Sequence, residues 1–67
     1  MKEFQVDGYF ETVGRQVEKL VSPRQYYLHN RVGGQGWSVQ GTDWAHCIVQ
    51  VDDPRMATWI GLQLERR

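Results

Sequence analysis

The stretch from residue 37 to residue 51 constrains the fold more than any other part of the chain. Apolar and polar residues alternate over residues 37–40, residues 41–43 (Gly-Thr-Asp) have the composition of a turn, and residues 44–51 end in the strand-forming run Ile-Val-Gln-Val. Two such runs around a short polar turn are typical of a hairpin. The sequence therefore predicts a strand, a turn and an antiparallel strand here.

A further strand is predicted near the N-terminus. Phe4, Val6, Gly8 and Phe10 alternate with the mostly polar residues at the odd-numbered positions from 3 to 11. A period of two is expected of a strand that buries one face. This strand can extend the hairpin into a small antiparallel sheet.

Three segments are compatible with either a helix or a strand. Over residues 10–21 the apolar residues fit one face of a helix, but Gly14-Arg15 could also be a hairpin turn. Residues 22–25 (Ser-Pro-Arg-Gln) have the chemistry of a helix start, whereas Tyr26-Tyr27-Leu28 favours a strand over residues 23–32. Both alternatives stay open for these two segments.

The C-terminal segment, residues 54–66, favours a helix. Asp53 can cap it, Pro54 suits its first position, and Ala57, Ile60, Gly61 and Leu64 share one face. The alternative is a final strand, since apolar residues also alternate here and a glycine costs a helix about 1 kcal/mol.

These elements predict one α+β domain over residues 1–67, with one or two short helices on one face of a small antiparallel sheet. An all-β small barrel is the alternative. At 67 residues with one cysteine, the chain can form no internal disulfide and has no Cys/His spacing for zinc. Since so small a domain buries roughly 60% of its unfolded surface, self-association is an expected source of further stability.

The net charge of the chain argues against binding that is driven by a strong positive electrostatic potential. Eight basic and eight acidic residues give a formal net charge of zero, so the chain lacks the positive potential that attracts nucleic acid or anionic membranes. It has no apolar run near the roughly 20 residues of a membrane span and no signal-peptide core. We expect a cytoplasmic protein with no membrane partner.

Charge is nevertheless uneven along the chain. No carboxylate side chain occurs between Glu18 and Asp43, while Lys19, Arg24 and Arg31 lie in that interval together with several aromatic residues. Aromatic rings beside a few cations can stack on single-stranded bases. The alternative function is therefore single-stranded nucleic-acid binding by residues 19–37.

No catalytic, cofactor-binding or metal-binding residue is predicted. His46 and Cys47 are adjacent in a predicted strand and point to opposite faces, so His46 cannot activate the thiol, and Cys47 is expected in the core. The glycine-rich residues 33–36 lack the lysine and hydroxyl residue of a nucleotide-binding loop.

The abundance of aromatic rings points instead to an interaction surface. Three tryptophans and three tyrosines occur in this short chain, and such rings are favoured at interfaces. We predict a non-catalytic, accessory or regulatory protein-interaction module that binds copies of itself and an unidentified protein. The predicted interaction residues are Trp37, Trp44, Tyr26, Tyr27, Arg24 and Arg31. Trp37 and Trp44 would form a cross-strand patch if the register opposes them, and would otherwise be core residues.

Overall fold

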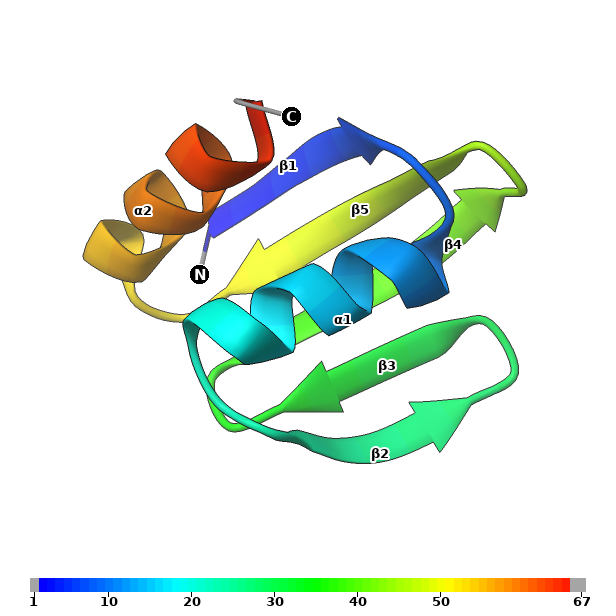
Figure 1. The fold of residues 1–67 in the computed structure, drawn as a ribbon, viewed down its shortest axis with the longest axis horizontal. Coiled ribbons are helices and arrows are strands. Elements are labelled where there is room, and N and C mark those ends of the chain that lie inside the picture. The colour runs from blue at the N-terminus through cyan, green and yellow to red at the C-terminus, as the bar shows by residue number, and fades with distance from the viewer. Residues whose placement is uncertain (1, 66–67) are drawn as a thin grey trace.

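The computed structural model of the protein describes residues 2–65. It has five strands and two helices, shown in Figure 1. Along the chain these are β1 (Lys2–Asp7), α1 (Phe10–Leu20), β2 (Arg24–Leu28), β3 (Arg31–Gly34), β4 (Trp37–Asp43), β5 (His46–Val51) and α2 (Pro54–Glu65). The sheet has the order β1-β5-β4-β3-β2, and all neighbouring strands are antiparallel.

The α+β prediction is confirmed, and the barrel alternative is wrong. β1 and β2 form opposite edges of the sheet and do not pair with each other, so the sheet stays open. Both helices pack on the same face, with α1 over β3, β4 and β5 and α2 against β1 and β5 (Figure 1). The core lies between the helices and the sheet, and neither of the two described helices lies on the opposite face of the sheet.

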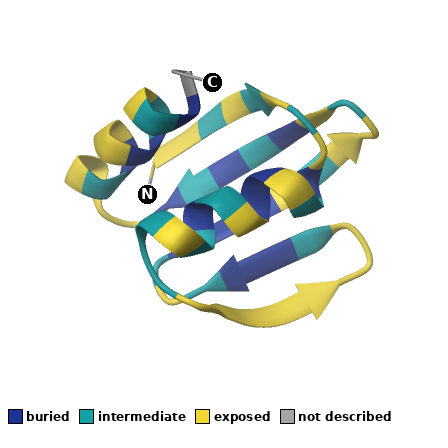
Figure 2. Ribbon diagram, in the orientation of Figure 1, coloured by how far each residue is buried: buried dark blue, intermediate teal, exposed yellow. Residues whose placement is uncertain are grey.

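The period of two in the strands decides which side chains enter the core. Val49 pairs with Phe4 on β1 and Val39 on β4, and all three face the helices, whereas Ile48 pairs with Gln5 and Gln40 on the open face. Figure 2 shows the resulting alternation of buried and less buried residues along β5. The buried apolar residues are Phe10, Val13, Val17, Val32, Trp37, Val39, Cys47, Val49, Val51, Ala57, Ile60 and Leu64.

Residues 10–21 form the helix rather than the hairpin. The predicted first strand ends at Asp7, because Gly8 takes a φ of 137° and Phe10 already begins α1. Gly14 is buried in the middle of α1 and not in a turn. A Cβ at this position would overlap the side chain of Val32, so the glycine lets α1 lie close to β3.

Residues 23–32 form a strand and a turn, so their helical alternative is wrong. Arg24–Leu28 is β2, which pairs with β3 around a turn at residues 29–30. The Ser22 hydroxyl, which could have capped a helix, instead accepts a hydrogen bond from the Trp37 indole at 2.9 Å. The hydroxyl group on which the helix prediction depended is therefore used in a tertiary hydrogen bond.

The hairpin of β4 and β5 is confirmed, but its turn lies at residues 44–45 and not at residues 41–43. Gly41 belongs to β4, where a Cβ would come within 3.0 Å of the Phe10 ring. The C-terminal helix is also confirmed over residues 54–65, while residue 66 lies outside the described residues, and the final-strand alternative is wrong. Asp53 caps this helix, since its carboxylate accepts the Arg55 N–H at 2.9 Å.

Candidate functional site

The two tryptophans of the β4–β5 hairpin lie in opposite environments. Trp37 pairs with Val51 and belongs to the core, where it is only 4% exposed. Trp44 lies in the turn and is 83% exposed. The proposed cross-strand pair of tryptophans therefore does not form. Of the two rings, only Trp44 is available to a binding partner.

The turn that carries Trp44 is braced by hydrogen bonds. The Ala45 N–H donates to the Asp43 carboxylate at 2.7 Å, and the Ala45 carbonyl accepts from the Gly8 N–H at 2.7 Å. His46 Nδ1 lies 2.9 Å from Asp43 Oδ1, and its Nε2 lies 3.7 Å from an Asp7 oxygen. The Ala45 N–H, and after it His46, hold the pKa of Asp43 below its usual value, so the bracing carboxylate stays ionised.

Three further aromatic rings, each in contact with the next, lie beside this turn. The centroids of Tyr9 and Phe10 are 4.8 Å apart, and those of Phe10 and Tyr27 are 6.1 Å apart. Tyr9 and Tyr27 are exposed, and Phe10 is buried beneath them. We call the surface formed by Tyr9, Phe10, Tyr27 and Trp44 the aromatic end. It brings together the start of α1, strand β2 and the β4–β5 turn at one end of the molecule (Figure 1).

Neighbouring charged groups hold Tyr27 in place. Its hydroxyl donates to Glu11 at 3.3 Å, and the Arg24 guanidinium lies 5.6 Å from the ring centroid, within the range of a cation–π contact. Partial desolvation, and after it the Glu11 carboxylate, raise the pKa of Tyr27 above its usual value. Tyr27 therefore keeps its proton as a hydrogen-bond donor, and the residue is 51% exposed.

A hollow of about 410 Å³ opens next to Trp44. It is lined by Tyr9, Phe10, His29, Asn30, Gly41, Thr42, Asp43 and Trp44. These residues come from three separate stretches of the chain, and only Trp44 among them was predicted as an interaction residue. No local pattern marks Tyr9, Phe10 or His29 as members of a site, because only the paired strands and the docked helix bring them together.

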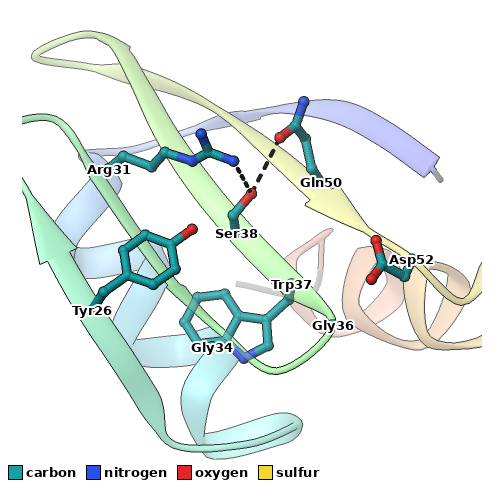
Figure 3. Close-up of a pocket in the computed structure, with 8 residues that line it drawn as sticks. All are labelled: Tyr26, Arg31, Gly34, Gly36, Trp37, Ser38, Gln50 and Asp52. Carbon is teal, nitrogen blue, oxygen red and sulfur yellow. Dashed lines mark hydrogen bonds between the residues drawn. The ribbon is translucent and has the colours of Figure 1, made fainter.

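The open face of the sheet carries a different arrangement, a row of hydrogen-bonded polar side chains (Figure 3). Arg31 donates to the Ser38 hydroxyl at 3.3 Å, Ser38 donates to the Gln50 carbonyl at 3.2 Å, and the Gln50 amide donates to Glu3 at 2.7 Å. The row crosses from β3 to β1 and links a cation to a carboxylate through two neutral groups. Ser38 is consequently only 7% exposed although no helix covers it.

Tyr26 closes one side of this row. Gly33 allows this, because a Cβ there would overlap the Tyr26 ring. Tyr26, Arg31, Ser38, Gln50 and Asp52 surround a small hollow of about 170 Å³, together with the start of β4 (Figure 3). The structure thus brings two predicted interaction residues, Tyr26 and Arg31, side by side on the open face and away from Tyr27 on the helix-covered face.

The basic, aromatic residues 19–37 do not form one surface. Lys19 lies between the helices beside Leu20 and Leu64, Arg24 lies beside Tyr27, and Arg31 lies on the open face. A nucleic-acid strand would have to contact these three places separately to use all three cations.

The remaining residues that could take part in chemistry, Cys47 and His46, are not brought together by the fold. Cys47 is buried, with its thiol 3.7 Å from the Val6 carbonyl oxygen, while His46 is exposed on the opposite face, as predicted. Residues 2–65 contain no group of three or more His, Cys, Asp or Glu side chains that could hold a metal ion. Neither described helix has the length and apolar character needed to cross a bilayer.

Comparison of the chain with protein-family models, with curated proteins and with solved structures gives no match. The aromatic end and the polar row are therefore the two candidate binding surfaces of the described residues. Of these two, the aromatic end exposes more ring surface, since Trp44 is 83% exposed there whereas Tyr26 beside the polar row is 37% exposed.

Proposed function

We propose that this protein is a non-catalytic protein-interaction module that binds its partner through the aromatic end. The observation that carries the proposal is Trp44, which is 83% exposed on a braced turn beside an aromatic-lined hollow. Tryptophan is strongly enriched among the residues that contribute most to binding at interfaces. An accessory or regulatory role follows from such a module.

The turn itself does not need a tryptophan. Short hairpin turns favour asparagine, aspartate and glycine, because these residues tolerate the backbone angles and supply local hydrogen bonds. Here Asp43 already supplies that bond through the Ala45 N–H, and Trp44 contributes only an exposed ring. A large apolar residue at this position is accounted for by an external contact rather than by folding.

The bracing of the turn favours binding energetically. Ordering a side chain or loop at an interface costs about 0.5–1.5 kcal/mol per immobilised side chain, and a turn that is already held loses less. Asp43 and His46 hold the turn from one side and the Gly8 N–H holds it from the other. Trp44 is thus presented on a preorganised backbone.

A protein partner accounts for the aromatic end better than a nucleic acid does. The carboxylates of Asp43, Asp7 and Glu11 lie at or next to this surface. Phosphates would be repelled by these charges, and Arg24 is the one cation that contacts the described rings. The alternative of single-stranded nucleic-acid binding would have to use the open face instead.

Photo-crosslinking in the cells that produce the protein tests this proposal. A photoreactive phenylalanine derivative replaces Trp44 in one variant and Trp59, an exposed residue on α2, in a matched control. We expect discrete protein adducts from position 44 and few from position 59, identified by mass spectrometry. Adducts to nucleic acid alone, or equal protein adducts from both positions, would contradict the proposal.

A further inference from the structure

We infer that the partner of the aromatic end is a second copy of this chain, and that two copies exchange Trp44 so that each indole enters the other copy's hollow. This inference rests on the proposed function, because it names the partner of the same surface. A two-fold dimer uses the same patch on both subunits. The patch must therefore carry both a protruding group and a recess, and here Trp44 lies on the rim of the hollow.

The hollow is open to an indole from outside. Trp44 does not fill the hollow of its own copy, since it remains 83% exposed at its rim. Tyr9 and Phe10 offer aromatic walls, and the hollow of about 410 Å³ has polar groups on its other side. A second ring can be stacked edge-to-face or offset against these walls, as aromatic pairs prefer.

The hollow also offers an acceptor for the incoming indole N–H. A buried tryptophan N–H normally needs a hydrogen-bond partner. Asn30 lines the hollow and donates its side-chain N–H to the Gly41 carbonyl at 3.4 Å, which leaves its amide oxygen as an acceptor. Thr42 also lines the hollow.

Charges near the contact are compatible with two identical copies. The chain has no net charge, so the copies do not repel each other over long distances. Asp43 directly precedes Trp44 and would approach the rim on which His29 of the second copy lies. Each Asp43 carboxylate is also hydrogen-bonded within its own chain, to the Ala45 N–H at 2.7 Å and to His46 Nδ1 at 2.9 Å.

The area involved predicts a weak dimer. A tryptophan ring buries roughly 150–250 Å², so two exchanged rings and the walls that cover them bury on the order of 800 Å² in total. Stable complexes bury about 1,200–2,000 Å², and smaller interfaces belong to weak or transient complexes. We therefore expect reversible association at high micromolar concentration rather than a permanent dimer.

Sedimentation equilibrium measures this association directly. Between about 10 µM and about 1 mM protein, the mean mass of the natural sequence should rise from 7.9 kDa toward twice that value. The Trp44→Ser variant should stay at 7.9 kDa throughout. Trp59→Ser is the matched control, because it removes another exposed indole outside the aromatic end, and it should associate as the natural sequence does.

A second measurement uses the unaltered chain and does not depend on the folding of any variant. In a mixture of isotope-labelled and unlabelled protein, isotope-filtered NMR should show contacts between the Trp44 indole of one copy and the Tyr9 or Phe10 ring of another. A mass of 7.9 kDa at every concentration, or dimerisation that is lost with Trp59→Ser and kept with Trp44→Ser, would overturn the inference. If the chain is monomeric but position 44 still crosslinks to a different protein, the inference fails and the proposed function stands. If the chain stays monomeric and position 44 gives no protein adduct, both the inference and the proposed function are wrong.

Discussion

The two ends of the β4–β5 hairpin use the same residue type in opposite ways. At the first residue of β4, Trp37 lies under the helices and its indole N–H is bonded to Ser22. At the other end, Trp44 projects from the turn with most of its ring exposed. Ring size and composition are identical, so the strand register and the turn position alone decide which tryptophan stabilises the fold and which is available for binding.

The largest predicted effect tests this division. Replacing Trp37 by alanine should cost about 3–5 kcal/mol of unfolding free energy, as truncation of a buried aromatic residue does. A domain of this size has only about that much stability, so the variant should be largely unfolded. The same change at Trp44 should alter the free energy of unfolding by no more than about 0.5 kcal/mol.

Urea unfolding followed by circular dichroism compares the two variants. Measurements should be made well below the concentration at which the protein associates, because binding between copies would add stability to the natural sequence. A Trp44→Ala variant that loses as much stability as Trp37→Ala would show that the two ends of the hairpin do not differ in the way described.

A smaller effect concerns the bond that makes a buried tryptophan possible at the first end. Ser22→Ala removes the acceptor of the Trp37 N–H, and a buried donor without a partner costs about 1–3 kcal/mol. Ser22→Thr keeps the hydroxyl and is the control, which should retain most of the stability. If both variants unfold at the same urea concentration as the natural sequence, water satisfies the indole and Ser22 is not needed.

Much of the fold could be predicted from local patterns. The alternation of residues in β1, β4 and β5 and the Asp53-Pro54 start of α2 were sufficient, because each signal lies within one element. Local signals failed where a tertiary contact overrode them. Ser22 had the chemistry of a helix cap, yet Trp37 occupies its hydroxyl and residues 24–28 become the edge strand.

The candidate site was less predictable than the fold. The presence of Trp44 in a site could be predicted from its residue type. Its exposure could not be predicted, because the turn was placed three residues too early in the sequence. Asp43 sets the turn through a side-chain bond that a strand pattern does not reveal. The hollow combines residues from three stretches of the chain, and their proximity depends on the register and on where α1 begins.

The smallest effect is expected from pH and concerns only the exposed end. The Ala45 N–H and His46 lower the pKa of Asp43, so this carboxylate stabilises the folded turn at pH values above its unfolded pKa. The contribution is lost as the pH falls through the lower, folded-state pKa. Because Asp43 is exposed, global stability should change little, while the Trp44 turn should loosen in acid.

Two-dimensional NMR across the acidic range detects this loosening as a shift of the Ala45 amide signal, with a midpoint below the usual pKa of aspartate. Asp43→Asn is the control, since the amide oxygen can still accept the Ala45 N–H but does not titrate in this range. The same titration should leave the Trp37 indole signal unchanged, because Ser22 and Trp37 carry no group that ionises there. Equal shifts at both tryptophans would mean that acid affects the whole fold, and that the turn is not a separately braced element.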